Sequence, residues 1–547
     1  MSKCHAIRPK LVLLLLLVCV GCGDTFRPVA TPLLPAQPSP AAAHSVLLVS
    51  SNGLLSSNGS NSPGTSSHID VSGDSNVGVA PLGLGPVHAT LIPSNTSLFV
   101  ANSLEDTVSS FGASSTGPVT TTSLPAGSVP VFVHTTQNTN VYVANFGSNT
   151  VAAISTANHV VTNPLITVGK QPVALAETSD GAKLYAVNEG DGTVTSINTA
   201  TLTAIATIPT DGGPVWALAR PDAVQVQPAG FRVYVLNSAG TVSTIDTAID
   251  TKILPNVTVG AGANFMVYDK TRTRLYVVNQ SSSNVVVLDA STDPPTPTNT
   301  PIDLTQAPAG STSLCATACH PVSMTVLPDG TRAYVVSYAL VADASRNPSA
   351  PAIEWQVSVV NPQNNTVRTV VPADPASTLI DVDTVNPTGC GAAPFGSSPL
   401  PFRLSIVAAA DSSRVYVASC DSGRIEVINT SNDTLISSAD GTAVLTIPAP
   451  ASTFQPPSVN VTTASPSGAN TTYSYILTSG PVLQVGMDIV ITGMADAGNN
   501  GTFTVTGLGA GTFTVANPSG VTATGQSGTG RVPTPPPQNP VFMLAGP

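Results

Sequence analysis

The chain has 547 residues and a formal net charge of −11, and only 9% of its residues are charged, against roughly 25% in ordinary globular proteins. Its polar surface must therefore be built mainly from Ser, Thr, Asn and Gly. The thin negative charge, with no cluster of Lys and Arg, argues against nucleic acid as a partner, because binding to phosphates requires concentrated basic side chains.

Residues 1–21 have the pattern of an export signal. Lys3 and Arg8 give a basic start, and residues 11–20 form an apolar run that is too short to span a bilayer of about 30 Å. The run ends in Cys-Val-Gly directly before Cys22, which resembles a bacterial lipoprotein signal, although Cys stands where Leu is usual. The resemblance implies cleavage before Cys22 and attachment of lipid to its thiol. An ordinary secretory signal is the alternative.

Residues 22–44 are rich in Pro and Ala, and we expect them to form a semi-rigid tether. Together with the lipid on Cys22, this segment would hold the folded body near a membrane. The sequence therefore predicts an exported lipoprotein that faces the periplasm or the cell exterior, with the membrane as one partner.

Residues 45–452 contain eight copies of one pair of phrases, spaced by about 42 to 58 residues with one wider gap of about 82. The first phrase is of the type Tyr-Val-x-Asn, and the second is of the type Thr-Val-x-x-Ile-Asp/Asn. The clearest copies of the first phrase are residues 141–145, 184–188, 233–237 and 275–279, and looser copies start near Val46, Leu98, Ala333 and Val415.

Each copy predicts four short antiparallel strands, and the fourth copy is the cleanest. Its strands are expected at residues 172–176, 183–187, 193–197 and 205–208. The second strand is apolar at successive positions, which is typical of a sheet buried on both faces. Blades packed around an axis give this burial, so the predicted fold is all-β, a single closed β-propeller of four-stranded blades.

The repeat resembles the YVTN family of β-propeller proteins found on bacterial and archaeal surfaces. The resemblance rests on the Tyr-Val-x-Asn phrases and on the connecting phrase Ile-x-x-Gly-x-x-Pro-Val, seen at residues 166–173. It implies the propeller fold, and it implies little about function.

The two ends of the repeat region complement each other. The first copy has a second strand, Val46–Val49, but no first strand before it. Residues 538–547 contain Pro540–Leu544, which matches the Pro-Val start of the other first strands. We therefore predict that this segment is the innermost strand of the first blade, which gives eight blades; seven is the alternative.

Residues 453–537 do not follow the repeat and predict a small inserted β module, either a barrel or a sandwich. Its strands are expected at residues 472–477, 488–491, 501–505 and 511–515. Strand parity places this module, and three of the four other large insertions, on one face of the propeller. Insertions gathered on one face favour a binding face for an unknown protein or polysaccharide, although unconstrained loop drift would give the same pattern.

Four cysteines follow Cys22, namely Cys315, Cys319, Cys390 and Cys420. An even number in an exported protein predicts disulfides, and three pairings are possible. The stretch from Cys315 to His320 is one residue longer than the Cys-x-x-Cys-His motif of c-type haem attachment. Because His320 also opens a predicted first strand and further ligands are lacking, we expect no haem, no other cofactor and no metal.

The predicted first strands carry a scatter of polar residues that includes His88, His134, Glu177, Asp269 and Arg403. No pair among them repeats as a general acid and base would, so no catalytic residue is assigned, and Trp216 and Trp355 are expected in the blade core. The function favoured by the sequence is a non-catalytic binding scaffold. The alternatives are a propeller hydrolase similar to lactonases, and a redox protein that uses Cys315, Cys319 and His320.

Overall fold

A computed structural model of the chain describes residues 45–52, 62–113, 119–220, 231–298, 300–308, 311–316, 318–341, 352–374, 380–381, 404–420, 423–437, 444–448, 457–479, 483, 488–531 and 539–546. This part of the chain is almost entirely β-strand. The helices within it are single 3-10 turns, η2 (Glu189–Asp191), η3 (Leu314–Ala316) and η5 (Ala497–Asn499). None of the helices in these ranges has the length and apolar character needed to cross a bilayer.

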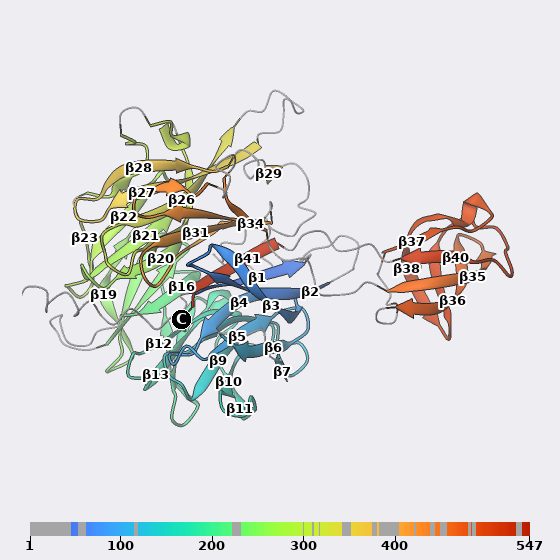
Figure 1. Cartoon of the computed structure of the whole chain (residues 1–547). Coiled ribbons are helices and arrows are strands. Elements are labelled where there is room, and N and C mark those ends of the chain that lie inside the picture. The colour runs from blue at the N-terminus through green and yellow to red at the C-terminus, as the bar shows by residue number, and fades with distance from the viewer. Residues whose placement is uncertain are drawn as a thin grey trace, which may run out of the picture.

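Eight antiparallel sheets form the main body (Figure 1). We call them blades 1 to 8 and name their strands A to D from the innermost outward. Blade 1 consists of β41 (Asn539–Ala545), β1 (Ser45–Asn52), β2 (Ser62–Asp70) and β3 (Ser75–Leu84), and blade 2 of β4 (Pro86–Leu91), β5 (Ser97–Asn102), β6 (Thr107–Gly112) and β7 (Thr120–Ser123). Blade 3 consists of β8 (Pro130–His134), β9 (Asn140–Asn145), β10 (Thr150–Ser155) and β11 (Val161–Thr167), and blade 4 of β12 (Pro172–Glu177), β13 (Lys183–Asn188), β14 (Thr193–Asn198) and β15 (Thr203–Pro209).

The second half of the body repeats this plan. Blade 5 consists of β16 (Pro214–Ala219), β17 (Arg232–Asn237), β18 (Thr241–Asp246) and β19 (Thr251–Thr258), and blade 6 of β20 (Ala263–Asp269), β21 (Arg274–Asn279), β22 (Asn284–Asp289) and β23 (Thr296–Pro297). Blade 7 consists of β25 (His320–Val326), β26 (Ala333–Val341), β27 (Ala352–Asn361) and β28 (Thr366–Pro372), and blade 8 of β30 (Leu404–Ala408), β31 (Arg414–Ser419), β32 (Arg424–Asn429) and β33 (Thr434–Leu435). In blades 6 to 8 a further short strand pairs with strand C: β24 (Ile302–Asp303), β29 (Ile380–Asp381) and β34 (Thr446–Pro448).

The prediction of a β-propeller is confirmed, and the described residues hold eight blades rather than seven. The fourth blade matches the predicted strands to within a few residues at each end. Strand β41 pairs with β1, with Leu47 opposite Leu544 and Val49 opposite Phe542, as the sequence predicted. The A strands of consecutive blades contact one another from β4 to β30, and β41 contacts both β30 and β4.

The Tyr-Val-x-Asn phrase forms strand B, which is buried on both faces between neighbouring blades. In blades 2 to 5 its asparagine is also buried and donates through Nδ2 to the threonine hydroxyl that begins strand C, at 3.0 to 3.1 Å. Hydrogen bonding of this amide to the strand beside it allows a polar residue to lie in an apolar blade. The asparagines are Asn102, Asn145, Asn188 and Asn237.

A tyrosine of strand B ties several blades to the next one. Tyr416 of blade 8 donates to Asp74 of blade 1 at 2.7 Å, and Arg414 forms an ion pair with the same carboxylate at 3.1 Å. The same arrangement joins Tyr185 to Asp250 between blades 4 and 5, and Tyr334 to Asp433 between blades 7 and 8. We call each of these pairs an interblade latch. The aspartates lie in the turn between strands C and D, in the left-handed backbone region that Asp tolerates.

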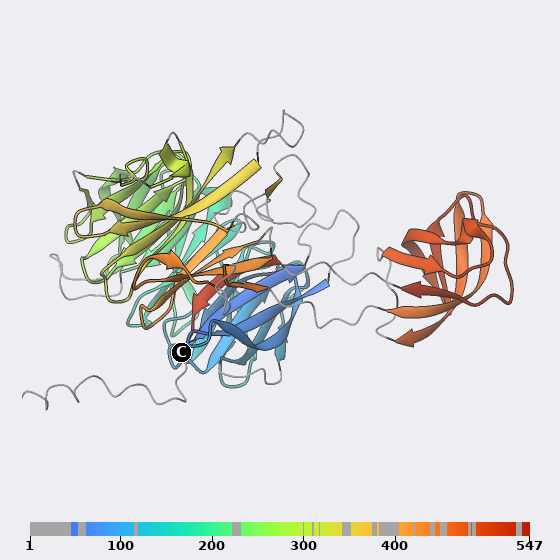
Figure 2. The ribbon, with the colours of Figure 1, turned by 45° about the horizontal axis from the view of Figure 1, so that its top comes forward.

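Residues that follow blade 8 form a separate closed barrel with the strand order β35-β36-β39-β38-β37-β40. Figures 1 and 2 show it to one side of the propeller. Its core includes Tyr473, Phe513 and Ile489. The barrel strands are β35 (Ser458–Ser467), β36 (Asn470–Ser479), β37 (Asp488–Thr492), β38 (Gly501–Gly509), β39 (Thr512–Ala516) and β40 (Gly528–Arg531).

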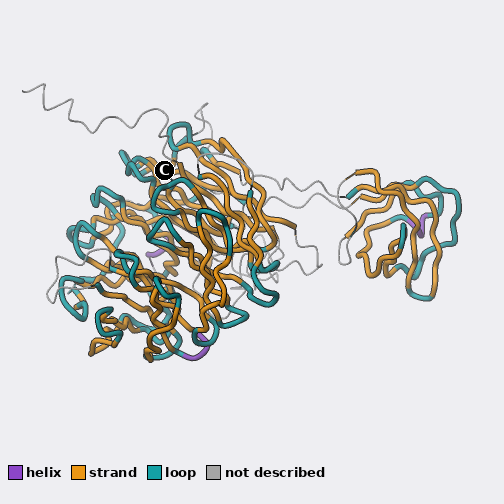
Figure 3. The backbone as a smooth tube through the Cα atoms, turned by 90° about the horizontal axis from the view of Figure 1, so that it is seen from below, coloured by secondary structure: helices purple, strands orange, loops and turns teal. Residues whose placement is uncertain are grey.

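The sequence predicted four of the six barrel strands and missed the first and the last. Strand β40 is short and reads Gly-Thr-Gly-Arg, a composition that is depleted in strands. Both of its glycines are buried, and a side chain at Gly530 would meet Ile489 and Val459 at 2.8 Å. The backbone of β40 therefore packs against the barrel core where a side chain would not fit. Figure 3 shows the strands of the barrel and of the propeller as two groups.

Candidate functional site

A cavity of about 660 Å³ lies among the A strands. The lining residues come from the second half of most A strands and from several turns between strands A and B. This position is the end of the central channel opposite to the face where strand parity places most of the large insertions. The lining side chains used below are His88, Phe132, His134, Glu177, Trp216, Arg220, Phe265, Lys270, Ser323 and Phe542.

A β-bulge repeated at the start of the A strands determines which residue lines the cavity. The pairing of strands A and B shifts between a residue at or next to the start of strand A and the residue two positions later, as between Pro130 and Phe132 or Pro214 and Trp216. We call the later residue the third position. The same shift occurs in blades 1, 2, 4, 6 and 7. The Pro-Val phrase seen in the sequence marks this bulge in most blades, and the residue after it lines the cavity in six of these seven blades.

Aromatic rings from five blades meet at these third positions. His88 stacks on Phe132 with ring centroids 3.8 Å apart and lies 4.3 Å from the ring of Phe542. Trp216 contacts Phe132 edge to face at 5.7 Å and Phe265 at 5.3 Å. We call His88, Phe132, Trp216, Phe265 and Phe542 the aromatic cluster. Blade 4 has only Ala174 at this position, so the rings of blades 3 and 5 can meet across it.

Trp216 and Trp355 differ in their surroundings. Trp355 is 1% exposed in the core between blades 7 and 8, as predicted. Trp216 was also expected in the blade core; its half-buried ring packs against the core of the blades and, in addition, lines the cavity, which the sequence did not predict. The signal that could have revealed this was its place after Pro-Val, where Phe stands in blades 1 and 3.

Both histidines of the cavity are uncharged at neutral pH. Burial, together with the neighbouring His134, lowers the pKa of His88 to about 3, although the Val133 backbone N–H bonded to its Nδ1 opposes the shift. Burial lowers the pKa of His134 to about 4. With such pKa values these rings contribute mainly polarizable flat surfaces and neutral nitrogen atoms at pH 7.

Glu177 is the one carboxylate among the described residues that line the cavity. It is 1% exposed, and its Oε2 accepts from the backbone N–H and the hydroxyl of Thr136, at 2.5 and 2.9 Å. Within the described part of the chain its Oε1 has no hydrogen-bond partner. Burial raises the pKa of Glu177, and the bonds from Thr136 act in the opposite direction.

The basic groups of the lining have different surroundings. Arg220 is 0% exposed, and its Nη1 lies 3.6 Å from Asp293, which also pairs with Arg232 at 2.8 Å. Arg232 lies 3.3 Å from Asp246 as well, so two arginines face two aspartates in this cluster. Lys270 is exposed at the rim.

The scattered polar residues of the predicted first strands are thus only partly brought together. His88, His134 and Glu177 line the cavity, whereas Asp269 does not and instead bonds to Thr271 and Arg272 at the end of β20. Tyr268 and Lys270 on either side of Asp269 line the cavity in its place. Arg403 lies outside the described residues.

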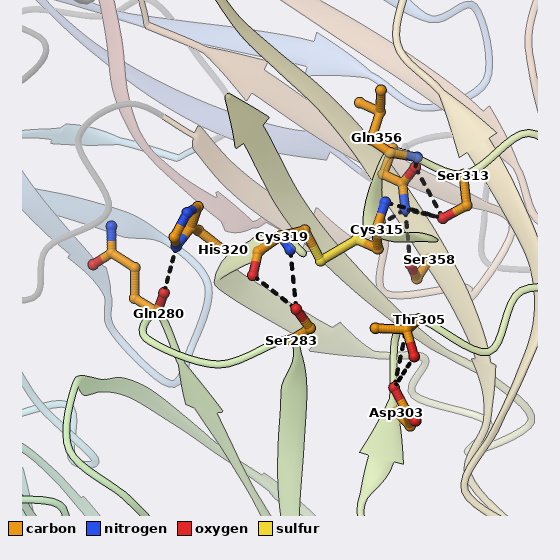
Figure 4. Close-up of a disulfide and its surroundings, with 11 residues drawn as sticks. Gln280, Ser283, Asp303, Thr305, Ser313, Cys315, Cys319, His320, Gln356 and Ser358 are labelled. Carbon is orange, nitrogen blue, oxygen red and sulfur yellow. Dashed lines mark hydrogen bonds between the residues drawn. A yellow bond between two sulfur atoms is a disulfide. The ribbon is translucent and has the colours of Figure 1, made fainter. Parts of the chain in front are cut away.

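The structure joins Cys315 to Cys319 in a disulfide beside β25 (Figure 4). Cys420 is also in a disulfide, and Cys390 and Cys22 lie outside the described residues. The Nδ1 atom of His320 lies 2.8 Å from the carbonyl oxygen of Gln280, and its ring stacks on Tyr338 at 4.8 Å. With both sulfurs bonded to each other, neither thiol is free to form the thioether bond of a c-type haem.

The described residues contain no group of three or more His, Cys, Asp or Glu side chains placed to hold a metal ion. Hydrogen bonds flank the Cys315–Cys319 disulfide: the backbone N–H of Cys319 donates to the Ser283 hydroxyl, and the backbone N–H of Leu314 donates to Gln356 Oε1. Its role in this arrangement is to fix the link between blades 6 and 7.

Comparisons with known proteins support the fold. No protein-family model matches the chain, and neither does any curated protein. The solved structure of dihydro-heme d1 dehydrogenase NirN in complex with DHE, a β-propeller protein, aligns with a TM-score of 0.52 over 76% of this chain and 75% of that one, at 9% identity. At this identity the likeness shows the fold alone.

Two other structures are similar over much of the chain. Apo AztD from Citrobacter koseri aligns with a TM-score of 0.48 at 11% identity, over 74% of this chain and 98% of that chain. Hydrazine synthase from Kuenenia stuttgartiensis aligns with a TM-score of 0.38 at 14% identity, over 56% and 78%. The eight blades themselves make the chain a member of the β-propeller class, and its function has to be argued from its own residues.

Proposed function

We propose that this protein is a non-catalytic binding scaffold whose central cavity takes a small, largely apolar molecule. The observation that supports the proposal is the aromatic cluster, which lines one side of a cavity of about 660 Å³. Cavities of this size, with aromatic walls and a few polar groups, are typical of small-molecule sites. Stacking and burial on these rings would supply most of the affinity.

One feature of the cavity favours the hydrolase alternative, and two features argue against it. The channel does contain two histidines and a carboxylate, as a lactonase-like site would require. However, a histidine with a pKa of about 3 or 4 is a weak base, since an effective general base has a pKa near the working pH. One oxygen of Glu177 is already engaged by Thr136. These features favour binding over catalysis.

The two tryptophans of the chain allow a direct test of the cavity. In a Trp355→Phe variant, Trp216 is the only tryptophan left, so its emission reports on the cavity. We expect 2-phenylethanol to change this emission in a saturable way. Ser323→Phe in the same background places the ring found at the equivalent position of blades 1, 3 and 6 into the cavity and should weaken binding at least tenfold.

The result has two clear readings. A saturable signal whose midpoint Ser323→Phe shifts to at least tenfold higher ligand concentration supports the cavity as the site. No saturation, or equal binding by the two variants, would refute the proposal, provided that circular dichroism shows both variants folded.

The cellular localisation of the protein is a proposal that rests on the sequence of residues 1–44, which lie outside the described residues. We propose that the protein is exported and anchored by lipid on Cys22. A Cys22→Ser variant should then leave the membrane fraction after cell breakage, whereas the parent should stay with it. Retention of the variant in the membranes would contradict lipid anchoring at this residue.

A further inference from the structure

Glu177 departs from the repeat at its position. It pairs with Leu184 of strand B, and in six other blades the residue with the equivalent pairing is uncharged. These residues are Leu91, Ala219, Tyr268, Val326, Ala408 and Ala545. The propeller fold therefore does not require a carboxylate here, and the role of Glu177 must be specific to blade 4.

One oxygen of this carboxylate has a structural role and the other does not. Oε2 joins the end of strand A in blade 4 to the turn of blade 3 through Thr136. Oε1 is buried without a partner among the described residues, in a residue that lines the cavity. A buried oxygen of this kind is unfavourable until a donor reaches it.

None of the basic side chains among the described residues forms a hydrogen bond or ion pair with this oxygen. Arg220, the arginine among the described lining residues, belongs to the cluster of two arginines and two aspartates and lies beside Asp293. Lys270 is exposed at the rim and has no ion pair within 4.0 Å among the described residues. A carboxylate in an apolar, aromatic surrounding favours a cationic donor.

We propose that the cavity selects molecules that carry a protonated amine on an apolar, ring-sized body, with the ammonium donating to Glu177 Oε1 and the body packed on the aromatic cluster. This inference rests on the proposed function, because it assigns a ligand class to the same cavity. The ammonium would supply the missing donor, and the rings of the cluster would attract the cationic end as well as the apolar body.

Three probes of nearly equal size test the inference. These are 2-phenylethylamine, 2-phenylethanol and 3-phenylpropionate, which end in an ammonium, a hydroxyl and a carboxylate. Their binding to the soluble propeller with its barrel, measured by calorimetry at pH 7.5, should be tightest for the amine. We expect the amine to bind at least tenfold more tightly than the carboxylate, which corresponds to about 1.4 kcal/mol.

A variant and a matched control identify the group responsible. Glu177→Gln keeps the shape and an acceptor for Thr136 but removes the charge, so it should weaken amine binding at least tenfold and alcohol binding less than threefold. Asp269→Asn alters another buried carboxylate at the end of an A strand, outside the cavity, and should leave the preference for the amine unchanged.

The outcomes separate this inference from the proposed function. Equal binding of all three probes, with loss on Ser323→Phe, would overturn the amine preference and leave the cavity as a binding site. An amine preference that survives in Glu177→Gln would overturn the role of Glu177. Failure of every probe to bind would count against both. The comparison of the three probes on the parent stands even if Glu177→Gln fails to fold.

Discussion

In this propeller, a residue that follows the repeat has a structural role, whereas the residues that shape the cavity are those that depart from the repeat. The positions that follow the repeat, such as Asn188 and Tyr185, are bonded inside the blades or to the next blade. The residues that give the cavity its character are exceptions, because His88 stands where Phe132 and Phe265 stand, and Glu177 stands where apolar residues prevail. The residues to which we assign a role in ligand binding are therefore the ones that depart from the repeat.

The buried His88 makes stability depend on pH. Its pKa is about 3 in the folded protein, below the ordinary 6.5, so the unfolded chain takes up the proton first as the pH falls. The stability contributed by the neutral ring is present above pH 6.5 and is lost as the pH falls toward 3. Relative to the parent, His88→Phe should therefore gain about 1.4 kcal/mol of unfolding free energy per pH unit between pH 5.5 and 4.

Urea denaturation of the two proteins at several pH values checks this expectation. The difference at pH 7.5 serves as the reference, because the histidine is neutral there in both states. Parallel stability profiles from pH 7.5 to 4 would show that His88 is not held neutral by its surroundings.

At the scale of elements, the interblade latch is the device that the sequence did not reveal. The tyrosine was visible in every clear repeat, but its partner aspartate lies in the turn of another blade, 342 residues away for Tyr416 and Asp74. The period and spacing of the sequence repeat predict the strands within each blade, so they do not predict a hydrogen bond between two blades. The hydrogen bond of the latch between blades 8 and 1 is buried.

We expect Tyr416→Phe to lower the free energy of unfolding by about 1 to 3 kcal/mol, because Asp74 loses a charge-assisted hydrogen bond in a buried place. The ring itself should still fit, since Phe99 fills the equivalent position in blade 2. The control is Tyr142→Phe in blade 3, because the corresponding turn of blade 4 carries Leu202 instead of Asp. Guanidinium denaturation measures the free energy of unfolding of both variants. Equal losses in the two variants would argue that the latch does not stabilise the propeller.

At the scale of the whole molecule, the sequence predicted the blade count and the pairing of β41 with β1, because both follow from counting strands. It also placed the inserted β module between the last blade and β41. It did not predict the cavity, whose shape depends on how the third residues of separate A strands meet in space. His88, His134 and Glu177 were visible as polar residues, but their convergence required the positions of three blades.

The position of the insertions supports a second proposal, a protein or polysaccharide partner on the loop-rich face. Because the cavity is lined by A strands at the other end of the channel, the two sites should act independently. Replacing residues 453–537 with a short linker should reduce recovery of such a partner in a pull-down and leave 2-phenylethanol binding unchanged. Equal recovery with and without the segment would remove the barrel from partner binding.

The pairing of β41 with β1 has a consequence for how the protein is made. Strand β1 is synthesised first among the described strands, and β41 is synthesised last, after the barrel. During synthesis the first blade keeps an open inner edge until almost the entire chain has been made. A prematurely terminated chain would keep that edge and lack Phe542 of the aromatic cluster. Closure of the first blade thus depends on synthesis of the last strand, and a truncated chain would present an unpaired strand edge to other chains.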